Sequence, residues 1–426
     1  MRTIRTAIIA CAASIAVFAG VFSAEAADTE TLPEDKVPVQ DTRGPSDPAP
    51  PGFSSWRALF AEQDRLNAAA ARIASVGEEQ DGFAGFIADP DKHVLQVYWK
   101  GVVPAAVQEA VAKSRTETPV EVIEASYSLK QLSGEVDQWI QTGKVSSAAP
   151  APDGSGIRLT VAGNQKAADL PRPAGATAPI SVENNAPMST AVADPVPLED
   201  AAASSPWRWR DSSPFYAGGK INPGGCTSGF SVWDVNGKRG MLTAAHCGKA
   251  GVPGVGSHVT NFFGDHMGWF DSELENRDIA IVHANSWGRM YTGAWNSSTS
   301  IPVVGMWKTW PGNYVCNSGS TTGENCSIKA TDHGVSMTLD GQYVKHLIRA
   351  KHTQGGCAVA KGDSGGPIFS YSWPNGSGPA ALAQGVTSGG SGSVYCASAG
   401  KYGFPTIYFA RVTDSLLAFQ ATLKMY

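Results

Sequence analysis

The stretch Gly362–Pro367, with the sequence Gly-Asp-Ser-Gly-Gly-Pro, constrains this chain more than any other. Its three glycines allow backbone conformations that other residues rarely adopt, so the chain can turn sharply and lie close to a bound molecule. Such a turn exposes the Ser364 hydroxyl and leaves the N–H groups of Gly362 and Ser364 to face a negatively charged oxygen. The stretch therefore predicts a nucleophilic serine beside an oxyanion hole.

Two further stretches supply the other groups that a serine nucleophile needs. Thr243–Cys247 predicts a strand end that carries His246, and Asn276–Val282 places Asp278 at the head of an apolar strand. An imidazole, with an unperturbed pKa of about 6.5, suits the task of taking the hydroxyl proton. A buried carboxylate then orients the ring and stabilises the imidazolium. We therefore expect His246, Asp278 and Ser364 to be catalytic.

Other acidic residues near His246 fit this role less well. Asp265 and Asp271 lie between His246 and Asp278, but neither precedes an apolar strand. Asp278 is therefore the preferred carboxylate.

The first 26 residues predict a signal peptide for export. Arg2 and Arg5 give a positive start, residues 7–22 are almost all apolar, and Ala24–Ala26 supplies small residues for cleavage. The apolar run is short for a membrane span, and no later segment approaches 18 apolar residues, so we expect a secreted protein without a membrane anchor. A lipid anchor at Cys11 is the alternative, but Cys11 precedes most of the apolar run.

Charge and ligand spacing argue against two classes of partner. The formal net charge is -5, which gives no basic surface for nucleic acid. The sequence also lacks closely spaced cysteine or histidine pairs typical of zinc sites. We therefore expect no nucleic acid, no metal and no other cofactor.

Removal of the signal peptide leaves an even number of cysteines, all in the C-terminal half of the chain. In an exported protein such a set predicts three disulfides. Fifteen pairings are possible, and the spacing alone does not select one. The six are Cys226, Cys247, Cys316, Cys326, Cys357 and Cys396.

The composition divides the rest of the chain into four parts. Residues 27–52 are rich in proline and charge and predict a disordered lead-in. Residues 53–165 predict a small α+β domain in the order α-β-β-α-β-α-β, including a helix whose start is capped by Ser128. Residues 166–205 predict a linker. Residues 206–426 contain short apolar runs separated by turns, which predicts an all-β domain.

The three motifs, in the order histidine, aspartate and serine, resemble those of chymotrypsin-like serine proteases. Val315–Gly323 followed by Cys326, and Gly385–Gly392, resemble the bacterial streptogrisin and α-lytic protease branch. The resemblance covers about residues 210–426 and implies two orthogonal six-stranded β-barrels with the active site between them. It identifies residues 53–165 as a pro-domain that helps its own protease to fold and inhibits it.

The resemblance also implies particular residue roles. It implies the disulfides Cys226–Cys247, Cys316–Cys326 and Cys357–Cys396, and a hydrogen bond from Ser388 to the buried Asp278.

One departure from the family concerns Asp363, beside the nucleophile. Animal relatives pair this aspartate with a new terminal amine, but Gly218–Ile221 matches their motif poorly. The bacterial branch instead provides an arginine where this chain has Asn317. Because an unpaired buried carboxylate is unfavourable, we expect another cation, with Arg210 and Lys361 as candidates, or a cluster of hydrogen-bond donors.

The expected substrate pocket lies between residues 355–361, including Ala358, and residues 387–391. Gly389 and Gly390 lack side chains, which leaves room for a large group and for pairing with an extended peptide. Trypsin-like pockets carry an aspartate at the position just before Cys357, and this chain has none there. Thr387 stands where glutamate-selective relatives carry a histidine. We therefore expect Thr387, Ser388, Gly389 and Gly390 to bind substrates with bulky apolar side chains.

Taken together, these features predict a monomeric secreted serine endopeptidase, made as a self-processing precursor, that acts on proteins or peptides. A non-catalytic binding module on a protease fold is one alternative, although the complete set of motifs argues against it. An esterase is another, although the Ser388–Gly390 groove favours peptides.

Overall fold

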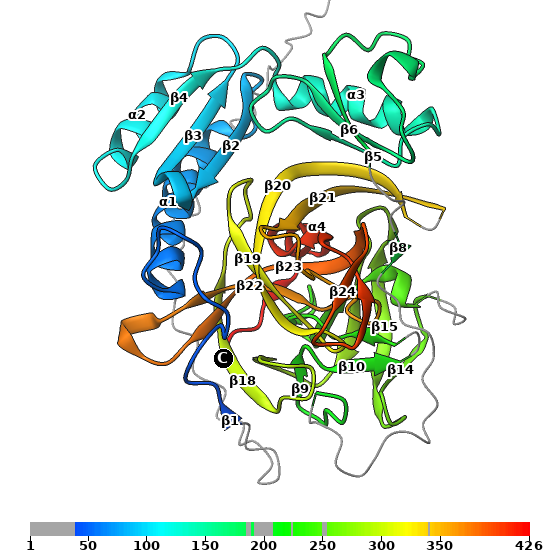
Figure 1. The fold of residues 1–426 in the computed structure, drawn as a ribbon. Coiled ribbons are helices and arrows are strands. Elements are labelled where there is room, and N and C mark those ends of the chain that lie inside the picture. Colours follow the sequence, from blue (N-terminus) through cyan, green and yellow to red (C-terminus); the bar gives the residue numbers. More distant parts are fainter. Residues whose placement is uncertain (1–38, 185–188, 191–207, 223–224, 249–253, 340) are drawn as a thin grey trace, which may run out of the picture. The chain divides into compact units, whose positions relative to one another are not determined.

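Figure 1 shows the computed structural model, which describes residues 39–184, 189–190, 208–222, 225–248, 254–339 and 341–426. The predicted signal peptide and residues 27–38 of the predicted lead-in lie outside these ranges. The helices are α1 (Trp56–Gly77), α2 (Ala105–Ser114), α3 (Leu129–Gln141) and α4 (Val412–Phe419). Within the described ranges, no helix combines the length and the apolar character that a membrane crossing needs.

The N-terminal region, residues 53–184, has the predicted order of helices and strands, with two strands added. The Ser55 hydroxyl caps α1 by accepting the Ala58 N–H at 3.2 Å. Ser128 and Gln131 form a capping box at the start of α3, as predicted. The strands are β2 (Phe83–Asp89), β3 (Val94–Trp99), β4 (Val120–Glu124), β5 (Ser147–Pro150), β6 (Ile157–Val161) and β7 (Ile180–Asn184).

Two predicted boundaries differ from the structure. The strand β7 and the short 3-10 helix Ala167–Asp169 lie in the range predicted as linker, and β7 pairs in parallel with β6. The strand β1 (Val39–Gln40) lies in the predicted lead-in and pairs in parallel with β18 (Thr299–Met306). Both strands are ordered by pairing with partners elsewhere in the chain, which local composition does not reveal.

The C-terminal region begins with an eight-stranded sheet in the order β11-β10-β14-β15-β16-β13-β12-β27. Its core includes Met241, Val259, Phe270 and Val282 from four of these strands. The strands are β10 (Lys220–Asn222), β11 (Cys226–Thr227), β12 (Ser231–Trp233), β13 (Arg239–Thr243), β14 (His258–Asn261), β15 (His266–Leu274), β16 (Ile279–Ala284) and β27 (Thr422–Leu423).

The second β unit is a closed barrel of six strands. Pairing runs from β20 through β19, β22, β23, β26 and β21 and returns to β20, so each strand is paired on both sides. The six strands are β19 (Tyr314–Gly319), β20 (Gly323–Leu339), β21 (Gln342–His352), β22 (Pro367–Ser372), β23 (Ala380–Ser391) and β26 (Thr406–Arg411).

Further strands lie around these two units: β9 (Phe215–Ala217), β17 (Ser286–Tyr291), β24 (Val394–Cys396) and β25 (Lys401–Gly403).

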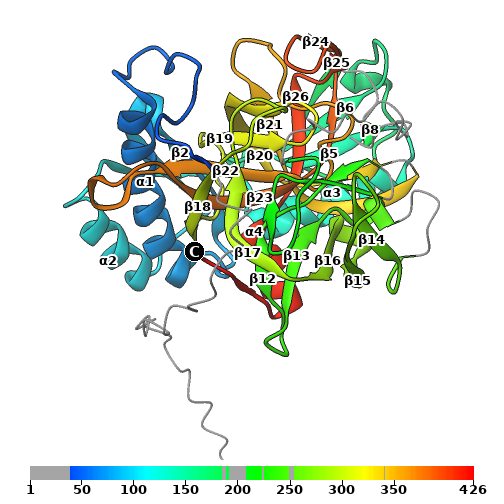
Figure 2. The same cartoon turned by 90° about the horizontal axis from the view of Figure 1, so that it is seen from below.

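The N-terminal region packs directly on the barrel. Strand β5 pairs antiparallel with β20, where Ala148 lies opposite Ser336 (Figure 1). Helix α1 lies beside β22 (Figure 2). The Gln63 side chain binds both main-chain groups of Tyr314, accepting its N–H at 2.6 Å and donating to its carbonyl at 3.0 Å. The first turns of α1 therefore belong to the same core as the barrel.

A buried ion network also joins this region to the barrel. Asp332 in β20 is fully buried and accepts from Arg349 at 2.7 Å and from Arg158 at 2.9 Å. Arg349 also lies 3.0 Å from Glu183, which pairs with Lys351 as well. Burial by itself raises the pKa of Asp332, but the two guanidinium groups outweigh burial and hold that pKa below its usual range. Asp332 and Arg349 both belong to the barrel and pair with each other, whereas Arg158 and Glu183, which complete the network, come from the N-terminal region.

The carboxyl group of Asp64, where α1 packs on the C-terminal region, is poorly solvated. Asp64 lies on α1 near Trp307, the residue that follows β18, and its Oδ1 atom is buried without a hydrogen-bond partner in the described part of the chain. Burial raises the pKa of Asp64 from 3.8 to about 7, which the nearby indole only partly opposes. The interface therefore favours the protonated form of this group.

The Asp64→Asn substitution should stabilise the precursor at neutral and higher pH. The parent loses stability as the pH rises from about 4 to 7, because there the unfolded chain ionises Asp64 while the folded chain keeps it protonated. We expect the variant's free energy of unfolding to exceed the parent's by about 2–4 kcal/mol at pH 8 and the difference to shrink toward pH 4. Denaturant unfolding between pH 4 and 8, with Ser364→Ala in both proteins to remove the predicted nucleophile, measures this.

Glu79→Gln provides the matched control, because Glu79 is exposed just beyond the end of α1. Its effect should not change across this pH range. A pH-independent difference for Asp64→Asn would contradict the prediction.

Candidate active site

His246 lies where the sequence predicted, at the end of a strand of the first β unit. It belongs to the short 3-10 helix Ala245–Gly248 that follows β13. The next residue, Cys247, forms a disulfide with Cys226 in β11, which fixes this turn against the sheet. The His246 side chain is only 11% exposed.

Asp278 holds this imidazole from the head of β16. Its carboxylate is 3% exposed and lies 2.8 and 2.9 Å from Nδ1 of His246 through its two oxygens. Its Oδ1 also accepts the main-chain N–H of His246 at 3.0 Å. Because a carboxylate only accepts hydrogen bonds, Nδ1 carries the proton and Nε2 is left as an acceptor. The contact with Asp278 therefore sets both the orientation and the tautomer of the ring.

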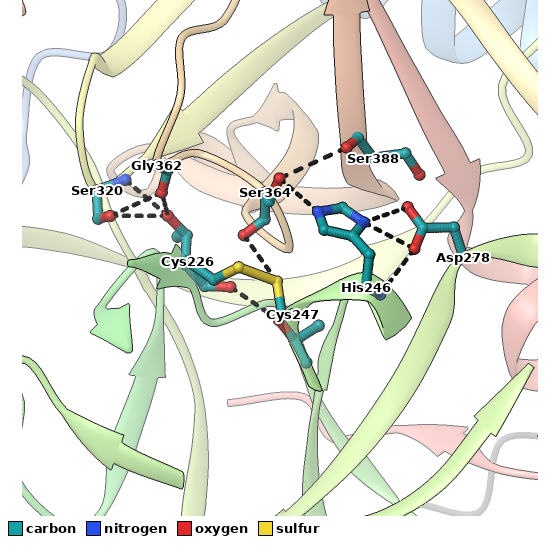
Figure 3. Close-up of a disulfide and its surroundings, with 10 residues drawn as sticks. Cys226, His246, Cys247, Asp278, Ser320, Gly362, Ser364 and Ser388 are labelled. Atoms are coloured by element: carbon teal, nitrogen blue, oxygen red, sulfur yellow. Dashed lines mark hydrogen bonds and ion pairs between the residues drawn. A yellow bond between two sulfur atoms is a disulfide. The ribbon is translucent and has the colours of Figure 1, made fainter. Parts of the chain in front are cut away.

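Ser364 completes the series from the second β unit. It lies in the loop before β22, and its Oγ is 2.8 Å from Nε2 of His246 (Figure 3). The structure thus brings together the three residues that the sequence singled out, hydrogen-bonded in the order Ser364, His246, Asp278.

The predicted support from Ser388 differs in the structure. Ser388 is fully buried, and its hydroxyl has no hydrogen-bond partner in the described part of the chain. Its carbonyl oxygen instead lies 3.5 Å from Oγ of Ser364 (Figure 3). Asp278 is held by His246, and the family-based prediction of a Ser388–Asp278 hydrogen bond is wrong for this structure.

The nucleophile loop has the conformation that its glycines allow. Gly362 and Gly365 have φ values of 108° and 84°. A Cβ on Gly365 would lie 2.2 Å from Oγ1 of Thr243, so only glycine fits there. The Gly362 carbonyl accepts the Thr227 hydroxyl at 2.7 Å. In the part of the chain that the structure describes, the N–H groups of Gly362 and Ser364 donate to no acceptor.

A donor cluster satisfies the buried carboxylate of Asp363. Its Oδ1 accepts the N–H groups of Thr321 and Thr322 at 3.0 and 3.1 Å. Its Oδ2 accepts the Thr322 hydroxyl at 2.7 Å and the Ala360 N–H at 2.9 Å. The expected cluster of hydrogen-bond donors is therefore present, and neither Arg210 nor Lys361 is among these donors.

A buried cation that the sequence did not reveal lies behind this cluster. Arg208 is fully buried and donates to the Gly319 carbonyl at 2.6 Å and the Ser318 hydroxyl at 3.0 Å. Gly319 touches Asp363, because a Cβ there would lie 2.0 Å from Oδ1. Burial lowers the pKa of Arg208 to about 10, while the negative charges of Glu324 and Asp363 oppose this shift. Nothing in the local sequence distinguishes Arg208 from Arg210.

The predicted substrate-binding residues line one strand and the loop beside it. Thr387, Ser388, Gly389 and Gly390 lie in β23, and Ala358 is buried in the loop before Ser364.

A segment of the chain itself pairs with this strand. Strand β8 (Ser189–Thr190) runs antiparallel to β23, with Thr190 opposite Gly389 and Ser189 opposite Gly390. A Cβ on Gly389 would lie 2.5 Å from the Ser189 carbonyl. The range predicted as linker therefore contributes a strand to the expected substrate groove.

The six cysteines form three disulfides with the pairing that the resemblance implied: Cys226–Cys247, Cys316–Cys326 and Cys357–Cys396. Cys226, His246 and Cys247 lie close enough to hold a metal ion, but both of these sulfur atoms are in a disulfide and offer no thiolate.

The comparisons with known proteins concern the C-terminal half of the chain. A family model described as Trypsin matches residues 212–415. Streptogrisin-C of Streptomyces griseus is 32% identical over 217 residues, which are 50% of this chain and 40% of that protein. The chain thus matches less than half the length of this relative. These two matches confirm the predicted resemblance and the chymotrypsin-like all-β fold of this half.

The matching solved structures also cover about half of this chain. The Nocardiopsis protease NAPase is 27% identical, covers 49% of this chain and 98% of its own, and has a TM-score of 0.37. Cellulomonas bogoriensis chymotrypsin is 28% identical, covers 49% of this chain and 97% of its own, and has a TM-score of 0.36.

The Thr322→Val substitution tests the donor cluster around Asp363. It removes the hydroxyl that donates to Oδ2, so a buried carboxylate loses one of four donors. We expect the free energy of unfolding to fall by about 1–3 kcal/mol, measured by denaturant unfolding in the Ser364→Ala background.

Thr321→Val is the matched control, because Thr321 donates to Asp363 through its main-chain N–H, which valine keeps. Its effect should stay within about 0.5 kcal/mol. Equal losses in both variants would show that the Thr322 hydroxyl has no special part in holding Asp363.

Proposed function

We propose that this chain, which carries a trypsin-family domain over residues 212–415, is a secreted serine endopeptidase made as a self-processing precursor. The observation that carries this proposal is the hydrogen-bonded series Ser364, His246 and Asp278. Homology to proteases implies protein substrates. Fold alone does not fix function, but a non-catalytic binding module has no need for a serine, a histidine and a carboxylate in this arrangement.

The proposed mechanism proceeds through an acyl-enzyme. Ser364 attacks the substrate carbonyl while Nε2 of His246 takes the hydroxyl proton and later gives it to the leaving amine. Asp278 stabilises the imidazolium through the contacts to Nδ1. The N–H groups of Gly362 and Ser364 bind the oxyanion, which is supported by their lack of acceptors within the described residues. Water then hydrolyses the ester by the same steps in reverse.

The pairing between β8 and β23 favours peptides over simple esters as substrates. Main-chain pairing along Gly389 and Gly390 recognises an extended polypeptide, and an ester without a peptide backbone cannot make it.

Secretion is supported by the disulfides as well as by the signal sequence. Three disulfides in one region form and persist in oxidising compartments such as the exterior of the cell.

The Ser364→Ala substitution should abolish peptide hydrolysis. Removal of a triad nucleophile lowers turnover by about a millionfold. The wild-type enzyme should also take up one fluorophosphonate per chain, with peptide mapping placing the label on Ser364, and should lose activity in step with labelling.

Ser377→Ala is the matched control, because Ser377 is exposed on a turn. It should leave activity and labelling unchanged. Casein hydrolysis that survives in Ser364→Ala would contradict the assignment. A protein that is labelled and hydrolyses esters but not casein would favour an esterase. A protein that is neither labelled nor hydrolytic would favour a binding module.

Self-processing is supported by the register of β8 on β23. Gly389 lies opposite Thr190 and Gly390 opposite Ser189. Ser388 is the neighbour of Gly389 in β23, and its carbonyl is 3.5 Å from the Ser364 hydroxyl. The described end of β8 therefore lies close to the nucleophile, which supports cleavage of the chain shortly after Thr190.

Expression of the full precursor should yield a mature chain that begins within a few residues after Thr190. Intact mass and N-terminal sequencing of the secreted product measure this, and the mass also reports three disulfides. The Ser364→Ala precursor should stay uncut in this segment. The same cut in Ser364→Ala would show that another protease makes it. A mature start beyond Arg208 would also contradict the prediction, because Arg208 is buried against the barrel.

A further inference from the structure

We propose that Phe404 fills the primary substrate pocket and restricts the enzyme to small apolar side chains, such as alanine, at the residue on the acyl side of the cut. The inference rests on the proposed function, because it concerns the pocket beside the same nucleophile. It replaces the expectation of bulky side chains, which depended on empty space beside Gly390.

The main chain of Phe404 is bound to one wall of the pocket. Its carbonyl accepts the N–H of Ala358 at 2.9 Å and that of Val359 at 3.2 Å, and its own N–H donates to the Val359 carbonyl at 2.8 Å. Residues 358–360 are the loop that leads to the nucleophile, and all three are fully buried. The main chain of Phe404 is therefore held against this loop by hydrogen bonds.

The side chain of Phe404 lies against the opposite wall. A Cβ on Gly390 would lie 2.6 Å from Cβ, Cγ and Cδ2 of Phe404. The space left by the missing side chain of Gly390 is thus already occupied by an aromatic ring of the same chain. Neighbouring Gly389 differs, because its missing side chain faces the Ser189 carbonyl of β8. Gly390 makes room for Phe404, and Gly389 makes room for the bound strand.

These two contacts place Phe404 between the loop 358–360 and strand β23. An aromatic substrate side chain would need the space between the same two walls. The wall at Ala358, Val359 and Ala360 carries alkyl groups and no charge, so it offers nothing to a basic or acidic side chain. What remains suits a small apolar group.

The test compares peptide anilides that differ only at the residue before the anilide: alanine, valine, leucine and phenylalanine. For the wild-type enzyme we expect kcat/KM for alanine to exceed that for phenylalanine by about 100-fold or more. In Phe404→Ala the ratio should fall at least about 10-fold, because removal of the ring opens space for larger groups. Tyr402→Ala is the matched control, since Tyr402 is 71% exposed in the same loop, and it should keep the wild-type ratio.

Titration with a fluorophosphonate before each assay separates this inference from the proposed function. A wild-type enzyme that titrates fully but prefers phenylalanine overturns the inference alone, as does a Phe404→Ala variant that titrates fully with an unchanged ratio. A wild-type protein that does not titrate overturns the proposed function. If Phe404→Ala yields no competent sites, the wild-type profile and Phe404→Leu, in which the ratio should fall by a smaller factor, decide the question.

Discussion

The imidazole of His246 has to be held at both nitrogens by groups from different β units, and the rest of the site depends on this requirement. Asp278 and His246 share the first unit, whereas Ser364 comes from the barrel. The contact between Nε2 of His246 and Oγ of Ser364 therefore depends on how the two units pack against each other. That packing is specified by hydrogen bonds at the nucleophile loop itself: Thr227 of the first unit donates its N–H to the Ser364 carbonyl at 2.7 Å and its hydroxyl to the Gly362 carbonyl.

The N-terminal region also contacts the barrel. It pairs β5 with β20 and contributes Arg158 and Glu183 to the ion network around Asp332. Barrel strands that pair over long sequence distances form slowly, because chain entropy is lost before contacts are gained. A region that binds β20 and β21 offsets part of this loss, which supports the role in folding that the family resemblance implies. The matching of buried charges also makes the association specific.

Groups whose chemistry leaves a local motif could be predicted from the sequence, whereas roles that depend on distant contacts could not. His246, Asp278 and Ser364 could be predicted because each lies in a characteristic short stretch. The roles of Arg208 and Phe404 could not be predicted, because they depend on contacts with residues distant in the chain: Gly319 for Arg208 and Gly390 for Phe404. The absence of side chains at Gly389 and Gly390 was visible in the sequence, but whether that space is open depends on β8 and Phe404. The prediction of a hydrogen bond from Ser388 to Asp278 was wrong, because family resemblance does not determine side-chain orientation.

A protease that binds substrates as extended strands must keep one edge of a strand available for pairing, and this edge is a liability in a folded protein. In the described chain that edge, at Gly389 and Gly390, is paired with β8, a segment joined covalently to the enzyme. Under the proposed function, covalent attachment gives the segment a high effective concentration and an advantage over free peptides for the same main-chain groups. Self-processing would remove this advantage, so we expect inhibition before the cut and activity after it from the same strand pairing.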